Sequence, residues 1–174
     1  MAGRDPSLMV RAAVVNLGAA AVTLLLFAFL VSVAAAPVGI ADPGARMAFW
    51  GRLALWPALV LFAMAVGVMA ARVPTQAFNP IDDPESRVQR VSQRVLANSV
   101  EQTLIFVPAL AALVASLPLP DLGVPVVATG LFVLGRLLFW GGYLIHPFLR
   151  APGMAMTLSV NLVVLGWAVL RAVA

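Results

Sequence analysis

The side chains best suited to chemistry stand at the start of a long apolar stretch. In "RVLANSVEQTLIF" (94–106), Arg94, Asn98 and Glu101 occupy positions i, i+4 and i+7. This spacing places them on one face of an α-helix. If that helix crosses a bilayer, an ionised group on it costs several kcal/mol unless it is paired or hydrated. The face must therefore look at protein or at a water-filled pocket.

A second polar stripe follows later in the chain, where Arg136, Tyr143 and Arg150 recur every seven residues. At the helical rise, Glu101 lies about 16 Å beyond Arg90, and Arg136 lies about 15 Å from the end of its own apolar stretch. The two charged groups thus reach similar depth from the same side. We predict that Glu101 and Arg136 are neighbours and form a structural ion pair.

Four of these side chains suit an anionic ligand. Arg94 and Arg150 supply guanidinium groups, Asn98 an amide and Tyr143 a phenol. Such donors match carboxylates or a thiolate. The chain has no cysteine and one histidine, so a cysteine nucleophile is excluded and no metal site is expected. Phosphate-binding loops, dinucleotide fingerprints and zinc-binding helix motifs are also missing from the sequence.

Each of these residues also has a structural interpretation. The expected pair of Glu101 and Arg136 could serve only to fix helix register, and Asn98 could hold two helices together through a hydrogen bond. Tyr143 could be an aromatic residue of the membrane interface, and Arg150 an arginine that marks the end of a span. The residue types alone leave both interpretations open.

The composition requires that lipid surrounds most of the chain. Of its 174 residues, 63% are hydrophobic and 10% are charged, whereas a soluble domain has about 25% charged residues. We predict an all-α integral membrane protein with spans near 8–36, 47–72, 87–117, 124–146 and 152–173. Each is long enough to cross about 30 Å of hydrocarbon. Continuous apolar runs exclude the alternating pattern of a membrane β-barrel.

The arginines predict the orientation. All eleven basic residues are arginine and are scattered among the spans, so the basic character does not indicate nucleic-acid binding. With the N-terminus in the cytoplasm, six of them face inward (Arg4, Arg11, Arg72, Arg87, Arg90, Arg150) and three outward (Arg46, Arg52, Arg171). The positive-inside rule favours this arrangement. We expect an integral protein of the bacterial inner membrane with a cytoplasmic N-terminus.

The two polar motifs resemble a known family. "RVLANSVEQTLIF" is similar to the R-x-x-x-N-x-x-E signature of the MAPEG proteins, the membrane-associated proteins in eicosanoid and glutathione metabolism. "GRLLFWGGYLIHPFLRAPGMAMTLSVN" resembles a later segment of the same family, and the two motifs keep the family order. The similarity covers residues 47–174, which we expect to form a four-helix bundle. Residues 1–40 would add an extra N-terminal transmembrane helix.

The resemblance implies a homotrimer with a glutathione site between neighbouring protomers, open to the cytoplasm. It implies that glutathione, as a substrate, is held by Arg94, Asn98, Glu101 and Tyr143. Arg150 would be the catalytic residue that stabilises the thiolate. Arg72, at the end of an earlier span, would reach the site from the adjacent protomer. Spacing agrees on one point: Tyr143 and Arg150 are two helical turns apart, so Arg150 can overhang a ligand.

The sequence departs from the leukotriene synthase branch of this family at two tyrosines. Phe139 and Gln102 stand in their places, so a ligand hydroxyl is missing at each. Two functions therefore remain open. One is a glutathione S-transferase or peroxidase acting on lipophilic electrophiles or lipid hydroperoxides. The other is a non-catalytic subunit that binds lipid or a partner membrane protein, with the extra helix, residues 8–36, as its contact surface.

Overall fold

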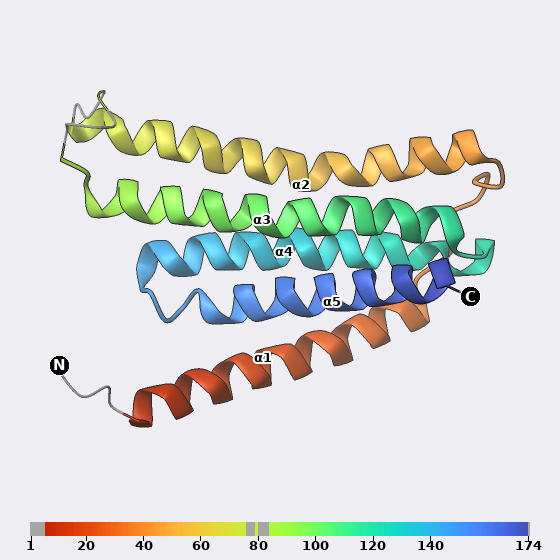
Figure 1. Cartoon of the computed structure of the whole chain (residues 1–174), viewed down its shortest axis with the longest axis horizontal. Helices are drawn as coiled ribbons and strands as arrows, with labels where there is room; N and C mark the ends of the chain where they lie inside the picture. Colours follow the sequence, from red (N-terminus) through yellow and green to blue (C-terminus); the bar gives the residue numbers. More distant parts are fainter. Residues whose placement is uncertain (1–5, 76–78, 80–83, 174) are drawn as a thin grey trace.

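The computed structural model describes residues 6–75, 79 and 84–173 and contains five α-helices (Figure 1). Short 3-10 turns, η1 (Val73–Thr75) and η2 (Leu119–Leu122), lie in two of the connections. No strand occurs in this part of the chain. The helices are α1 (Pro6–Val33), α2 (Pro43–Arg72), α3 (Arg87–Ser116), α4 (Gly123–Ile145) and α5 (Ala151–Val173).

All five helices are long and apolar enough to cross a membrane. The predicted all-α membrane fold is therefore confirmed. Arg4, which contributed to the predicted orientation, lies outside the described residues.

The helix boundaries follow from local chemistry. Asp42 caps α2, since its Oδ1 accepts a hydrogen bond from the Ala45 backbone N–H at 2.9 Å. Ser86 caps α3 in the same way, accepting from the N–H of Gln89 at 3.1 Å. These side chains satisfy backbone donors that have no partner within the helix. Pro118 and Pro147 follow the ends of α3 and α4, and proline disfavours helical geometry in the residue before it.

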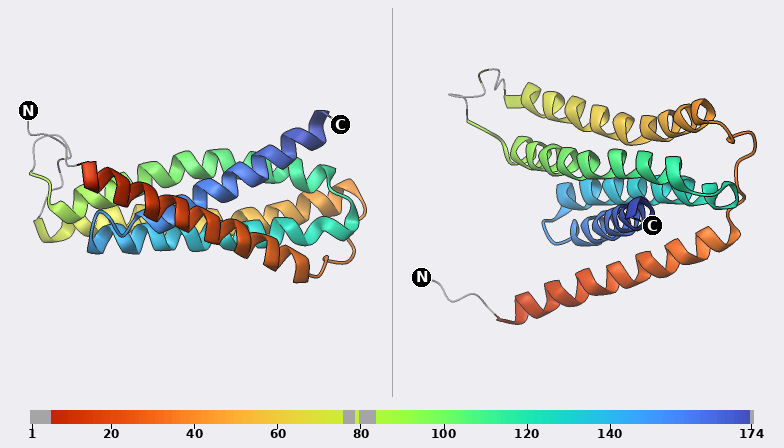
Figure 2. Two further views of the ribbon diagram at one scale, coloured as in Figure 1. Left: turned by 90° about the horizontal axis from the view of Figure 1, so that it is seen from below. Right: turned by 45° about the vertical axis from the view of Figure 1, so that its right-hand side comes forward.

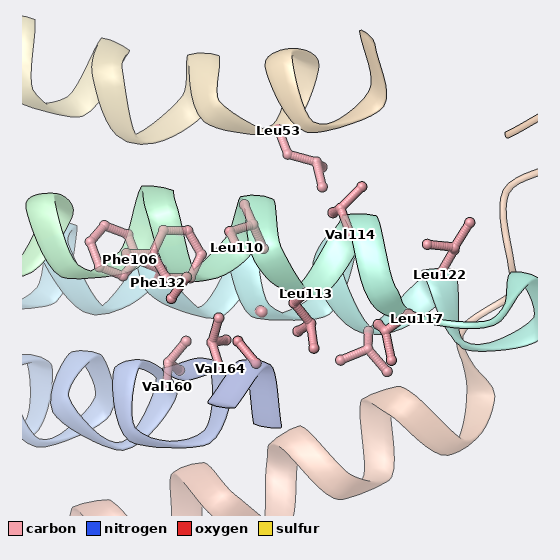
Figure 3. Close-up of a cluster of buried hydrophobic side chains, with 14 of the residues drawn as sticks. Leu53, Phe106, Leu110, Leu113, Val114, Leu117, Leu122, Phe132, Val160 and Val164 are labelled. Atoms are coloured by element: carbon pink, nitrogen blue, oxygen red, sulfur yellow. The ribbon is translucent and has the colours of Figure 1, made fainter. Parts of the chain in front are cut away.

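One apolar core joins the helices at the end of the bundle that holds the C-terminus (Figure 3). The rings of Phe106 and Phe132 stack within it, with centroids 4.2 Å apart. A second cluster of buried residues lies toward the other end: Met64, Val91, Val95, Phe139 and Tyr143. Through this second cluster, Phe139 and Tyr143 of α4 face the interior of the bundle.

Helix α1 lies at the edge of the array and crosses α5 obliquely (Figure 2). It contacts α5 most and α4 less. Thr23 and Phe27 are buried on the face turned to the bundle, whereas Met9, Val14 and Leu17 are exposed. The second half of α1 thus packs on the core, while most of its first half stays open to the surroundings.

Two arginines cap the C-terminal end of α3. The Arg46 Nη1 donates to the backbone oxygens of Val114, Ala115 and Leu117 at 2.6 to 3.1 Å. The Arg171 Nη2 donates to the Ser116 oxygen at 2.8 Å. A cation at a helix C-terminus is favourable, and these carbonyls lack partners within the helix. The two arginines therefore tie α2 and α5 to the end of α3.

Candidate functional site

A cavity of about 450 Å³ lies near the end of the bundle where α3 begins and α4 ends. Arg94 and Asn98 line it from α3, and Phe139 and Tyr143 from α4. Arg150 comes from the turn between α4 and α5. The remaining lining residues are Ala12, Asn16, Pro147, Phe148, Ala151 and Met154. Two guanidinium groups and, among the described residues, no carboxylate line this space, so it favours an anion.

Four side chains from α4 and the turn after it form a row of cations and rings. The Arg136 guanidinium lies over the Phe139 ring and that of Arg150 over the Tyr143 ring, each 4.6 Å from the centroid. The two rings meet edge to face, 5.8 Å apart. A cation over an aromatic face is attracted to it. This row holds Arg150 beside the cavity. Because α4 ends at Ile145, the turn after the helix places Arg150 there, and not the helical spacing from Tyr143 on which the prediction rested.

Arg136 is only 1% exposed, and its hydrogen-bond partners are neutral. Its Nε donates to the Thr157 hydroxyl at 2.9 Å, and its Nη1 donates to the Asn98 Oδ1 at 2.9 Å and to the Ser99 hydroxyl at 3.4 Å. The Asn98 oxygen is thereby engaged, and the amide –NH₂ remains as a donor. Arg136 therefore sets the orientation in which Asn98 presents itself to the cavity.

The expected ion pair between Glu101 and Arg136 is not formed. Glu101 is exposed and makes no salt bridge to any residue that the structure describes. The estimated depth of Arg136 was correct to within one helical turn, since Arg136 contacts Asn98 and Ser99 of α3. The buried face of α3, however, carries Ser99 and Gln102. Glu101 lies two residues beyond Ser99, which is about 200° around the helix. It is exposed in the single chain and not buried against α4.

Two further residues lie elsewhere than the cavity. Arg72, at the last turn of α2, borders a separate surface hollow with Val66 and Val73. Gln102, which stands where the leukotriene synthase branch has a tyrosine, is buried, and its backbone and side-chain oxygens accept hydrogen bonds from the Asn161 amide at 3.2 and 2.8 Å. Phe139, the other departure from the family pattern, does line the cavity.

Several contributors to the site were not predicted from the sequence. Ser99 and Thr157 hold Arg136, and Met154 adds a weak contact of its sulfur at 3.9 Å from Nη2. Ala12 and Asn16 bring α1 to the cavity wall. The amide of Asn16 within an otherwise apolar helix was the one visible signal. Nothing in the residue pattern showed that this amide would face the same space as Arg94.

Glycines allow the close approach that builds this region. A Cβ on Gly153 of α5 would collide with the Phe139 backbone nitrogen, and one on Gly142 with the Leu149 oxygen. Gly153 thus brings α5 against α4 at Phe139, and Gly142 lets the turn carrying Arg150 fold back on the helix. The position of the site depends on both.

The geometry brings together Arg94, Asn98, Tyr143 and Arg150, whereas Glu101 is exposed and does not line the cavity, and Arg72 lies apart. Their roles toward a ligand remain predictions. A search of curated proteins finds no match to the sequence. The family model of the MAPEG family matches residues 53–170, which include α3, α4 and parts of α2 and α5. The match covers more than half of the chain, and the protein belongs to the MAPEG family, a family of membrane proteins of eicosanoid and glutathione metabolism.

Proposed function

We propose that this protein is a membrane glutathione S-transferase or peroxidase that acts on lipophilic electrophiles or lipid hydroperoxides. One observation carries the proposal: Arg94, Asn98, Tyr143 and Arg150 line a single cavity in which the part of the chain that the structure describes places no acidic residue. Its volume, about 450 Å³, is within the range of small-molecule sites, about 300–1,000 Å³. Glutathione, with two carboxylates and a thiol, matches this set of donors.

The proposed roles follow from the hydrogen-bond donors that each side chain can offer to a ligand. The guanidinium of Arg94 and the –NH₂ of Asn98 would bind carboxylate and peptide oxygens of glutathione. The Tyr143 hydroxyl has no hydrogen-bond partner among the described residues, so it can donate to the ligand. Arg150, held over the Tyr143 ring, would stand next to the sulfur. A neighbouring guanidinium lowers the pKa of the glutathione thiol because it favours the charged form.

The thiolate formed in this way supports two reactions. With an unsaturated aldehyde, the sulfur lone pair forms a C–S bond at the β-carbon, the C=C pair moves to give an enolate, and water returns a proton to the α-carbon. With a hydroperoxide, two glutathione molecules supply two electrons, and the products are an alcohol, water and glutathione disulfide. Both reactions require a stabilised thiolate, which is the contribution assigned to Arg150.

The exposed face of α3 supports the proposed homotrimer. Glu101 lies there among Val100, Leu104 and Ile105, all exposed in the single chain. An ionised carboxylate among apolar side chains at membrane depth is costly against lipid. Neighbouring copies would cover this face, bring Glu101 toward the amino group of a bound glutathione, and supply Arg72 from an adjacent α2.

Binding in detergent tests the proposal directly. Purified protein is titrated with glutathione, and the thiolate is followed by its ultraviolet absorbance. The expected result is a saturable thiolate signal at neutral pH, together with conjugation of chlorodinitrobenzene. A wild-type protein that shows no thiolate signal at millimolar glutathione would refute the proposal.

One observation favours the second function, a non-catalytic subunit that binds lipid or a partner membrane protein. The two tyrosines of the leukotriene synthase pattern are replaced, and Gln102 is turned into the bundle interior. The cavity thus has fewer hydroxyl donors than that pattern implies. Glutathione binding without any turnover on electrophiles or hydroperoxides would support this function.

A further inference from the structure

We propose that α1 forms the wall of the site that receives the second, lipophilic substrate, and that the Asn16 amide binds the polar group of that substrate. This inference rests on the proposed function and adds to it a helix that lies outside the matched residues 53–170. The substrate class is an apolar molecule with an oxygen acceptor near one end, such as an alkenal or a fatty-acid hydroperoxide.

The first argument is the chemistry of Asn16. Between Ala12 and Val31, the only side chains of α1 that can form hydrogen bonds are Asn16 and Thr23. The Thr23 hydroxyl is buried and donates to the Ala19 oxygen at 2.7 Å. The Asn16 Nδ2 donates to the Ala12 oxygen at 2.8 Å, which uses one of its two N–H groups. Its other N–H and its oxygen have no partner among the described residues.

An unsatisfied amide is costly in a membrane helix that faces hydrocarbon. Asn16 instead lines the cavity, together with Ala12 one turn before it. Asn16 is exposed in the single chain, so a molecule bound in the cavity could reach its amide. An oxygen of a bound substrate would accept from the free N–H of Asn16.

The second argument is the path from the bilayer. Helix α1 crosses α5 and contacts it and α4, whereas α3 lies on the other side of these two helices (Figures 1 and 2). Around the same part of α1, Met9, Val10 and Val14 are exposed and apolar. A lipophilic molecule dissolved in the bilayer can thus reach the cavity beside α1, opposite the guanidinium of Arg94.

The third argument is the character of the lining. Beside Ala12, the apolar contributors include Phe139, Phe148 and Met154. These side chains suit an apolar chain, and methionine adapts to different shapes. The cavity therefore combines donors for an anionic peptide with an apolar portion that carries a single amide.

The experiment compares two pairs of variants in lipid vesicles of phosphatidylcholine. Ala12→Phe fills the cavity wall, and Ala13→Phe is its control, because Ala13 is exposed and does not line the cavity. Asn16→Ala removes the amide, and Asn16→Gln restores an amide in the same place. Three quantities are measured: glutathione affinity from the thiolate absorbance, KM and kcat for hydroxynonenal, and photolabelling by a diazirine fatty acid, located by mass spectrometry.

We expect Ala12→Phe to raise the KM for hydroxynonenal at least tenfold and to reduce the photolabelling of α1, while Ala13→Phe changes neither. Asn16→Ala should raise the same KM about fivefold, the scale of one hydrogen bond, and Asn16→Gln should recover part of the loss. Glutathione affinity should stay at the wild-type value in Ala13→Phe. In Ala12→Phe and the two Asn16 variants it should change several-fold less than the KM for hydroxynonenal, since Ala12 and Asn16 line the same cavity as the glutathione donors.

Equal KM values and equal labelling in Ala12→Phe and Ala13→Phe would overturn the inference. A parallel fall of glutathione affinity in Asn16→Ala would also overturn it, because the amide would then act through the peptide site. If the wild-type protein shows no thiolate signal, the proposed enzyme fails separately. The photolabelling comparison still decides whether α1 receives an apolar ligand.

Discussion

A buried arginine without an acidic partner organises the site at the scale of single residues. Arg136 donates to Asn98, Ser99 and Thr157, and among the described residues no carboxylate neutralises it. Buried charge is costly unless its hydrogen bonds are satisfied. The arginine thus depends on Asn98 for an acceptor, and Asn98 depends on the arginine for its orientation.

This dependence gives the first prediction, Asn98→Asp. The new carboxylate still accepts from Arg136 and adds an opposite charge, so thermal stability in detergent should equal or exceed that of the wild type. Glutathione affinity should fall at least tenfold, because the carboxylate lacks the –NH₂ donor and repels an anion. Asn98→Leu is the size-matched control and should lose about 1–3 kcal/mol, since it leaves Arg136 short of an acceptor. Equal destabilisation by Asp and Leu would contradict the account.

The second prediction concerns Arg150. Arg150→Ala should abolish the glutathione thiolate signal at neutral pH and lower any turnover about 10²-fold, the scale for removing one preorganised electrostatic donor. Binding of the peptide should fall less, because Arg94 and Asn98 still line the cavity. The control is Arg87→Ala, an exposed arginine at the same end that does not line the cavity. Equal thiolate signals in the two variants would reduce Arg150 to a marker of the helix end.

Single residues also show what the sequence could not determine. The depth of a residue along a helix follows from counting residues. The predicted depth of Arg136 therefore agrees with its contacts to Asn98 and Ser99 of α3. The rotation of a helix depends on which of its faces packs, and that is a tertiary property. Glu101 therefore pairs with nothing in α4, and Gln102 turns inward to Asn161.

At the scale of elements, the number and type of helices were predictable from hydropathy alone. Their ends were less so. We expected the second span to begin near residue 47, but α2 begins at Pro43 because Asp42 caps it. The Asp-Pro pair carries this signal in the sequence. The η2 turn (Leu119–Leu122) was not predicted, because a short 3-10 turn leaves no periodic pattern.

The contact between α4 and α5 gives the third prediction, Gly153→Ala. The added Cβ would meet the backbone of Phe139 and the Gly135 oxygen, so the two helices must separate. Such overpacking costs about 1–3 kcal/mol, and thermal unfolding in detergent should begin several degrees lower. The matched control is Gly166→Ala on the same helix, where nothing lies within 4 Å of the added Cβ. It should leave stability unchanged or raise it by about 0.5–1 kcal/mol. Equal melting temperatures of the two variants would show that α4 and α5 are not in close contact at Gly153.

At the scale of the whole molecule, the two ends of the bundle differ in charge. Among the described residues, Arg11, Arg72, Arg87, Arg90 and Arg150 lie at or near the end where α1 begins (Figure 1). Arg46, Arg52 and Arg171 lie toward the other end. Two of these three, Arg46 and Arg171, donate to the carbonyls that end α3, so the helix itself accounts for their presence there.

The fourth prediction is the orientation that this asymmetry favours. Positive charges are retained on the cytoplasmic side, so the N-terminus and the mouth of the cavity should face the cytoplasm. The chain has no cysteine, and single introduced cysteines can therefore report each side of the membrane without background labelling.

Two exposed positions serve as reporters. Val38→Cys lies in the turn between α1 and α2, and Pro84→Cys lies in the connection before α3. A membrane-impermeant maleimide should label Val38→Cys in intact cells and Pro84→Cys only after permeabilisation. The opposite labelling would put Arg150 and the cavity on the external face. Glutathione is abundant in the cytoplasm. A cavity on the external face would therefore be separated from the thiol on which the proposed reaction depends.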